Sequence, residues 1–265
     1  MKLQAMLQGL INLPATILCM VFIVVVVVLS QAGLQLYQSV LGKREFRQGN
    51  EVAGIVFGGI SLLYSLVLAF VIVAVWENYE SLNNTIEDEA DKLNGILAHS
   101  AALPPHIKKP LDTAILNYCN RVVEQEWKMQ SGRRSLTPSA IPSLRMMLLQ
   151  AHPQDDTQQS VFSVIDQDLS SVSELRRTRL SHSRSQVPQL VWFVLKAGSL
   201  MLIVFSYFFC VPSLRVKRIY LFFLSSCIAM SMFLVYALDH PFAGSARVSN
   251  EPYREVMSEI EQENQ

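Results

Sequence analysis

The sequence predicts an all-α integral membrane protein, with four transmembrane helices in two hairpins and a helical extramembrane insert between them. Three observations support this prediction. The chain of 265 residues is 51% hydrophobic but only 17% charged, whereas soluble domains carry about 25% charged residues. The low charge is confined to four long apolar stretches. The polar segment between them repeats apolar residues every three or four positions, as an amphipathic helix does.

The four apolar stretches are each long enough to cross a bilayer, because a helix of roughly 20 apolar residues spans the hydrocarbon core. They cover about residues 13–34, 52–76, 188–211 and 219–238. The valines at positions 24–28 would favour a strand in water, but in lipid only a helix satisfies its own backbone groups. The first stretch is also longer than the apolar core of a signal peptide, so we expect it to be a retained anchor.

Short connections pair the four helices into two hairpins, residues 13–76 and 188–238. Their turns then lie on one side of the membrane, while the insert at residues 77–187 and the polar C-terminal tail at residues 239–265 lie on the other. The basic residues of the turns are Lys43, Arg44 and Arg47 (turn 42–51) and Arg215, Lys217 and Arg218 (turn 212–218). Because short cytoplasmic loops are rich in Lys and Arg, their density favours an insert outside the cell, although the total numbers on the two sides are nearly equal.

The insert is expected to be helical, and its first helix continues the second membrane helix. Apolar residues recur every three or four positions from Tyr79 to Leu97, with no proline before Pro104. This helix should therefore project from the bilayer until that proline. Three further helices are expected, from about residue 107 to Gly132, from 142 to 151 and from 157 to 175.

Charged residues at the two ends of the insert allow alternative interpretations. The acidic side chains between residues 77 and 91 would either solvate the polar face of a helix, which we favour, or bind a cation. The arginines between residues 176 and 184 would either anchor the chain at lipid headgroups, which we also favour, or attract anions.

The residue patterns that most chemistry needs do not occur in the sequence. It has no glycine-rich phosphate loop, nucleophile elbow or zinc-ligand spacing. The 22 basic side chains balance the 22 acidic ones, which gives no indication of nucleic-acid binding. Cys119 is the only cysteine of the insert and has no disulfide partner there. We therefore expect no catalytic residue, metal site, cofactor or nucleic-acid partner, and the chain is not expected to be an enzyme.

Small residues form a stripe along the second membrane helix at Gly54, Gly58, Ser61 and Ser65. Small residues three or four apart let helices approach closely in lipid, where packing drives association. We interpret the stripe as a helix-packing face. Alternatively, in an oligomer the stripe or the apolar face beside it would line a pore.

Lys196 is the one charged residue within the four apolar stretches. A lysine inside the bilayer usually has a partner or a function. Asp239 and Glu77 stand at the ends of membrane helices on the same side, so one interpretation is a buried ion pair of Lys196 with Asp239 or Glu77. The other is that the lysine stem lies in lipid and its ammonium reaches the headgroups.

Three segments of the sequence carry motifs of a known family. They are Leu66 to Tyr79 followed by Glu87 to Ala90, then Glu174 to Trp192, and the closing run Leu238-Asp239-His240-Pro241-Phe242-x-Gly244. The residues of these motifs expected at the membrane interface are Trp76, Asp239, His240, Pro241, Phe242 and Gly244. Together the segments resemble the bestrophin-like domain family of bacterial integral membrane proteins.

This resemblance implies an assembly and a function. Bestrophins proper are pentameric anion channels with a cytosolic insert and a hydrophobic neck on the second membrane helix. For this chain the resemblance implies a multi-pass homo-oligomer in the bacterial inner membrane that passes small inorganic ions through a neck at Leu68, Val71, Ile72 and Val75. It also implies a cytosolic insert, opposite to the side that charge density favours. The alternative function is a non-conducting membrane scaffold or envelope sensor whose helical insert binds a partner.

Overall fold

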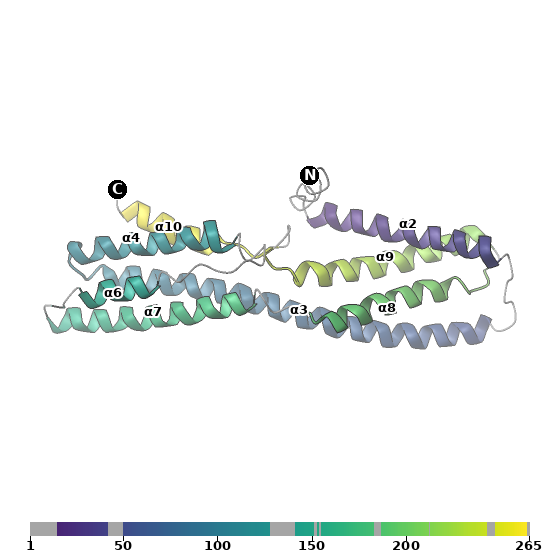
Figure 1. Cartoon of the computed structure of the whole chain (residues 1–265), viewed down its shortest axis with the longest axis horizontal. Coiled ribbons are helices and arrows are strands. Elements are labelled where there is room, and N and C mark those ends of the chain that lie inside the picture. Colours follow the sequence, from purple (N-terminus) through teal and green to yellow (C-terminus); the bar gives the residue numbers. More distant parts are fainter. Residues whose placement is uncertain are drawn as a thin grey trace. The chain divides into compact units, whose positions relative to one another are not determined.

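The computed structural model of this chain describes residues 15–41, 50–127, 141–150, 153, 155–182, 187–211, 213–242 and 247–263. Within these ranges the chain forms helices and short connections, with no strand. The helices are α2 (Ala15–Leu41), α3 (Asn50–Ser100), α4 (Pro105–Arg121), η1 (Val122–Glu126), α6 (Ile141–Gln150), α7 (Asp156–His182), α8 (Gln189–Ser206), α9 (Leu214–Leu238) and α10 (Glu251–Glu263) (Figure 1). The all-α fold expected from the sequence is therefore confirmed. The predicted helix end at Gly132 and the motif residue Gly244 lie outside the described residues.

The chain divides into two compact units, and α3 belongs to both, its first part to one unit and its second part to the other. The membrane unit comprises Met1–Glu77 and Val187–Ala246, and the insert unit comprises Asn78–Gln186 and Arg247–Gln265. Four helices of the described chain are long and apolar enough to cross a membrane, namely α2, α3, α8 and α9. They correspond to the four stretches expected from the sequence. α8 has only 18 residues, against 27 in α2 and 25 in α9.

Many large apolar side chains of the membrane unit are exposed. α2 packs along α9, and α8 also packs on α9 (Figure 1). Side chains on all of the spanning helices face outward, and Leu29, Phe70, Leu190 and Phe223 are each exposed over more than 60% of their surface. A soluble protein rarely exposes so much contiguous apolar surface, whereas lipid tails solvate it well. The outer surface of this unit is therefore suited to a bilayer.

Two tyrosines pack on glycines and bring the membrane helices close together. The ring of Tyr64 on α3 lies so near Gly198 on α8 that a Cβ at Gly198 would come within 2.5 Å of it. A Cβ at Gly33 on α2 would likewise come within 2.6 Å of the hydroxyl of Tyr207. The Tyr64 hydroxyl lies 2.6 Å from Ser199 Oγ, and the Tyr207 hydroxyl donates to a carbonyl of α2 at 2.8 Å. Both hydroxyls thus find inside the protein the partners that lipid tails cannot offer.

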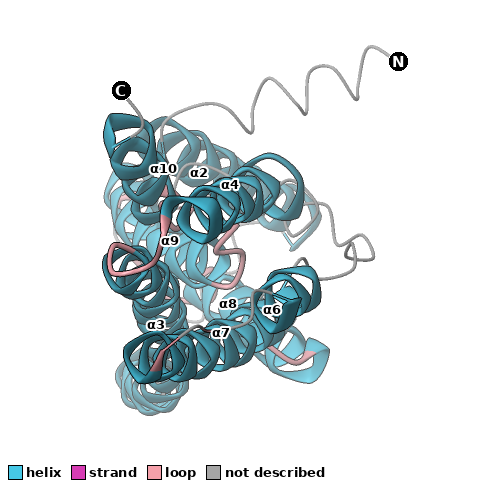
Figure 2. Cartoon of the chain, turned by 90° about the vertical axis from the view of Figure 1, so that its left-hand side faces the viewer, coloured by secondary structure: helices cyan, strands magenta, loops and turns pink. Residues whose placement is uncertain are grey.

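The insert unit has an apolar core formed by several helices. Five helical segments pack side by side (Figures 1 and 2), namely α4, α6, α7, α10 and the second part of α3. Both α6 and α10 pack on α4, and α6 also packs on α7. Its large, fully buried apolar side chains include Leu82, Ile86, Leu93, Ile96, Leu111, Ile115, Ile165 and Leu169. Their recurrence every three or four residues matches the apolar pattern of the sequence.

The C-terminal segment forms a helix where a polar tail is predicted. α10 buries Tyr253, Val256 and Ile260 and packs on α4, where Glu263 pairs with Lys108 at 2.7 Å. Only three apolar residues among many acidic ones mark this face, so the segment is predicted as a polar tail. In the structure, residues from Arg247 onward belong to the insert unit.

Replacing Gly198 by alanine should destabilise the membrane unit, because the new Cβ would overlap the ring of Tyr64. Overpacking of this kind costs about 1–3 kcal/mol, so we expect a lower thermal midpoint for the detergent-solubilised protein. Gly59→Ala is the matched control, since nothing lies within 4 Å of a Cβ at Gly59. Equal midpoints for the two variants would contradict the close approach of α3 and α8.

Candidate functional site

One face of α3 in the membrane unit is covered by the chain itself. Tyr64, Leu68 and Val75 lie on this face and are 9%, 8% and 6% exposed, and Val71 and Ile72 beside them are half-buried. Through Tyr64 this face contacts α8 and α9. The four residues expected to form a neck thus share the packed side of the helix, and the two most buried of them are occupied by packing within one chain.

The opposite face of α3 is exposed and apolar. It carries Ile55, Leu62, Leu66, Phe70 and Val73, which are between 52% and 77% exposed. These residues follow one another at steps of seven, four, four and three, so they lie on one side of the helix. This face is available to lipid or to another molecule along the membrane-spanning part of α3.

The stripe of small residues lies between these two faces. A Cβ at Gly58 would meet nothing within 4 Å, and a Cβ at Gly54 would meet only an atom of Phe209 at 4.0 Å. Ser65 is exposed and Ser61 is half-buried. The stripe therefore makes little contact inside the chain and leaves room for the close approach of another helix.

The residues expected to form a buried ion pair are not in direct contact. Asp239 is 5% exposed and accepts hydrogen bonds from the backbone N–H of Val187 at 2.7 Å and the indole N–H of Trp192 at 3.2 Å. The Lys196 ammonium lies 5.3 Å from the centre of the same indole ring, within cation–π range. Glu77 is exposed. Val187 and Trp192 thus provide the hydrogen-bond donors to the Asp239 carboxylate. The indole of Trp192 contacts both Asp239 and Lys196, and it replaces the direct ion pair that was expected between them.

The motif at the end of α9 fastens the start of α8. Besides the two hydrogen bonds accepted by Asp239, His240 Nδ1 lies 3.1 Å from a carbonyl oxygen in the last turn of α9. Pro241 and Phe242 are buried, whereas Trp76 is exposed. The carboxylate of Asp239 therefore ties α9 to the residue at which the chain returns to the membrane unit, Val187.

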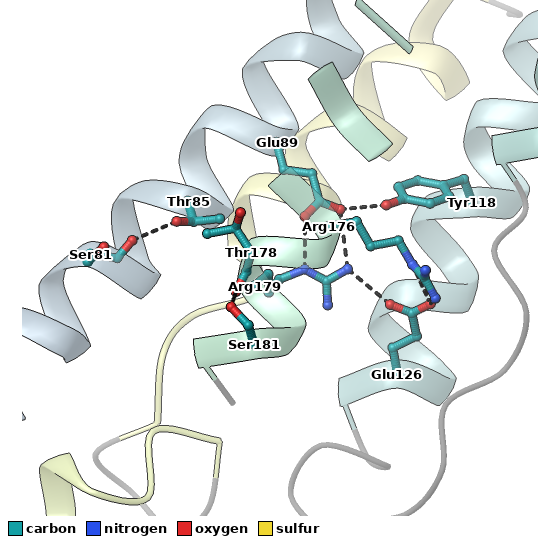
Figure 3. A network of polar contacts seen from close by, with 9 residues as sticks. All are labelled: Ser81, Thr85, Glu89, Tyr118, Glu126, Arg176, Thr178, Arg179 and Ser181. Atoms are coloured by element: carbon teal, nitrogen blue, oxygen red, sulfur yellow. Dashed lines mark hydrogen bonds and ion pairs between the residues drawn. The ribbon is translucent and has the colours of Figure 1, made fainter. Parts of the chain in front are cut away.

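The insert unit encloses four charged side chains in one network (Figure 3). Glu89 of α3 and Arg179 of α7 are fully buried, and Glu126 of η1 and Arg176 of α7 are 1% and 8% exposed. Arg179 binds Glu89 through Nε at 2.9 Å and Glu126 through Nη2 at 3.0 Å. Arg176 binds the second oxygen of Glu126 at 2.6 Å, and the Tyr118 hydroxyl donates to Glu89 at 2.5 Å. Two arginines balance two glutamates, so the network buries no net charge.

Helical spacing directs these charges toward the core. Arg176 and Arg179 extend the buried apolar stripe of α7 by further steps of four and three residues. Glu89 likewise falls within the buried apolar stripe of α3, three or four residues from its apolar neighbours. Glu126 ends η1, a π-helical turn that continues α4. Val122 and Glu126 follow the buried Cys119 of α4 at steps of three and four, so Glu126 stays on the face that α4 buries.

Burial and the charge of Glu89 determine the protonation states of Arg179 and Tyr118, and burial that of Tyr253. Burial alone would lower the pKa of Arg179, but the adjacent carboxylate of Glu89 raises this pKa well above its ordinary value. Burial and the charge of Glu89 also raise the pKa of Tyr118, and burial raises that of Tyr253. The rings of Tyr253 and Trp127 lie 5.7 Å and 5.9 Å from the Arg179 guanidinium. Arg179 therefore stays charged and the two tyrosines stay protonated.

The favoured interpretations of the charged runs are wrong for three of these residues. Glu89 does not solvate a polar face, and Arg176 and Arg179 do not anchor the chain at lipid headgroups, since the structure buries all three. Their place in the apolar stripes was the sequence signal for burial, because a charged residue at such a position needs a buried partner. An enclosed network offers no surface to a ligand, so its role is to fasten α3, η1 and α7 together.

Cys119 on α4 lies near Glu89 but offers no reactive thiol. Burial raises its pKa to about 12, so the thiol is protonated at neutral pH, whereas nucleophilic chemistry requires the thiolate. Among the residues that the structure describes, no three His, Cys, Asp or Glu side chains are grouped so that they could hold a metal ion.

Comparison with known proteins identifies a family and a shared fold. A family model described as Bestrophin-like domain matches residues 16–253. Two variants of a bacterial bestrophin homologue from Klebsiella pneumoniae have similar crystal structures. One has a TM-score of 0.68 at 11% identity and covers 93% of this chain and 98% of that chain, and the other has a TM-score of 0.65 at 14% identity and covers 92% and 98%. No functionally curated protein matches the sequence.

Arg179→Met should strongly destabilise the insert unit, because it leaves the buried carboxylates of Glu89 and Glu126 without their shared partner. Breaking a buried pair in this way costs about 3–5 kcal/mol. Arg145→Met is the matched control, since its ion pair with Asp166 is exposed and such pairs contribute about 0–1 kcal/mol. Denaturant unfolding followed by circular dichroism measures both variants, and similar losses would contradict the enclosure of the network.

Proposed function

Because the chain belongs to the bestrophin-like domain family, we propose that it forms a homo-oligomer in the membrane and passes small ions, as a bestrophin-like anion channel. The exposed apolar face of α3 is the observation that carries this proposal. It extends from Ile55 to Val73 along the spanning part of the helix, while the chain itself covers the opposite face. A helix with one packed and one exposed apolar face is suited to lining a path between copies.

We propose the gate on the exposed face, at Leu66, Phe70 and Val73. Apolar constrictions of this kind close a path by excluding water. Only side chains that a single chain leaves exposed can line a path between copies. Leu68 and Val75, which the family resemblance implies as neck residues, are covered within the chain. In this proposal they belong to the packed face of α3 and do not line the path, and the two half-buried neck residues lie beside them.

Contact between copies is proposed at the stripe of small residues. Gly54, Gly58 and Ser65 have open space or solvent around them in the single chain, and small residues favour close helix packing in lipid. The stripe lies beside the exposed apolar face of α3. When two copies pack through their stripes, the exposed apolar face of each copy therefore points toward a shared axis. Five copies follow if the bestrophin arrangement applies. We propose the bacterial inner membrane as the location, and the charge density of the turns favours an insert outside the cell.

A second candidate is a non-conducting scaffold or envelope sensor whose insert binds a partner protein. The observation in its favour is that the insert is a compact unit with its own apolar core and an enclosed charge network. Such a unit can bind a partner without any passage of ions. Neither candidate needs a catalytic residue.

Purified protein in planar lipid bilayers should give discrete chloride currents. We expect Phe70→Ala to increase them, because a smaller side chain widens and hydrates the gate. Leu68→Ala is the matched control on the same helix, and it should cost about 2–5 kcal/mol of stability with the unit conductance unchanged. Currents that respond to Leu68→Ala or Ile72→Ala but not to Phe70→Ala would place the gate on the covered face, and silence in several salts would favour the scaffold.

Gly58→Leu should reduce the number of copies in the assembly, because a large side chain fills the space that a neighbouring helix would need. Cys227→Leu adds the same side chain at an exposed position of α9 and should leave the subunit number unchanged. Native mass spectrometry of the detergent-solubilised protein measures this number. An unchanged number for Gly58→Leu would exclude the small-residue stripe as the contact.

A further inference from the structure

The membrane unit contains a cavity of about 520 Å³ at the end of the spanning helices where α8 stops. Leu34 of α2, Phe57 of α3, Phe209 after α8, and Leu221 and Leu224 of α9 form much of its wall. This volume falls within the roughly 300–1,000 Å³ of small-molecule sites. The lining is suited to a long apolar chain rather than to a compact polar molecule.

The cavity exists because α8 is short. It ends at Ser206, and the described residues between it and α9, 207–211 and 213, form no α-helix. Side chains from neighbouring helices satisfy the backbone of this connection. The Asn50 carboxamide donates to the carbonyl of Cys210 at 3.2 Å and accepts from its N–H at 3.1 Å, and Lys217 Nζ donates to the carbonyl of Tyr207 at 2.8 Å. These polar groups are directed at the backbone, which leaves the wall of the cavity largely apolar.

The rim of the cavity carries a positive charge. Lys217 lines it, and its ammonium lies 2.8 Å from the carbonyl oxygen of Tyr207. Arg215 and Arg218, at the start of the same helix, are exposed but do not line the cavity. Tyr220 also lines the cavity, and tyrosine is enriched at the level of lipid headgroups. An apolar cavity therefore lies beside positive charge at a membrane interface.

We propose that this cavity binds an acyl chain of an anionic phospholipid, whose negatively charged headgroup lies at the basic rim. One molecule then satisfies two features of the site, since its chain fills the apolar wall and its charge complements the rim. A zwitterionic lipid of the same chain length fits the apolar wall but does not complement the charge of the rim. The bound lipid would fill a hollow beside the connection between α8 and α9 and hold that connection in place. This binding requires only that the helices lie in a membrane and does not depend on ion passage.

Native mass spectrometry of the full-length protein tests the site. The protein is extracted with mild detergent from vesicles that contain equal amounts of phosphatidylglycerol and phosphatidylcholine with the same acyl chains. We expect phosphatidylglycerol to be retained in preference. Leu224→Trp fills the cavity and should abolish retention, whereas Leu234→Trp, at an exposed position of the same helix, should not change it.

The charge of the rim is tested separately. Lys217→Gln should lower the preference for phosphatidylglycerol about fivefold, the effect expected of one basic residue near an anionic headgroup. Lys109→Gln, at an exposed position of the insert unit, should leave the preference unchanged. Thermal unfolding shows that each variant is folded. Added phosphatidylglycerol should also raise the midpoint of the unmodified protein but not that of Leu224→Trp.

Three results would overturn the proposal. Equal retention of the two lipids would show that the rim does not select a negative headgroup. Unchanged retention and unchanged stabilisation in Leu224→Trp would show that the lipid binds elsewhere. A lower subunit number in Leu224→Trp, with lipid retention unaffected, would show that a second copy of the chain occupies the cavity.

Discussion

A polar group that is removed from water must find its partner inside the protein, and both units of this chain are built around that requirement. In the membrane unit the hydroxyls of Tyr64 and Tyr207 bond to neighbouring helices, and Asn50 satisfies the backbone beyond the short helix α8. In the insert unit Arg179 and Glu89 satisfy each other. The two groups of each of these contacts come from different segments of the chain, so satisfying the polar groups also determines which helices lie together.

This requirement explains which parts of the fold were predictable. In lipid, an apolar stretch of sufficient length has one stable form for its backbone, so α2, α3, α8 and α9 follow from composition alone. The spacing of apolar residues predicts α4, α6 and α7 in the same way, because one face of each is buried. α10 is not among the predicted helices, because the many acidic residues of its segment indicate a polar tail, although Tyr253, Val256 and Ile260 follow one another at the helical steps of three and four.

The candidate site was less predictable, because it depends on which helix faces meet. Spacing places Leu68 and Val75 on one face of α3 but does not reveal that α8 and α9 cover it. The position of Lys196 along α8 suggests a nearby carboxylate but not the indole of Trp192 between them. Glu89 stands in an acidic run, and its place between the buried Ile86 and Leu93 distinguishes it from its solvated neighbours, but the sequence does not identify Arg179 as its partner. The pairings of Trp192 with Asp239 and of Arg179 with Glu89 join residues far apart in the chain, and a local pattern does not contain them.

The packing of Tyr253 against Arg179 has a consequence for biosynthesis. Arg179 precedes α8 and α9 in the chain, and Tyr253 follows both. Because residues leave the ribosome in sequence order, the ring that completes the cover of this guanidinium is made only after both membrane helices have been synthesised. The insert unit therefore matures late, once membrane insertion is far advanced. A chain stalled before α10 would display an uncovered arginine and an open core, which is the kind of incomplete product that cellular proteases remove.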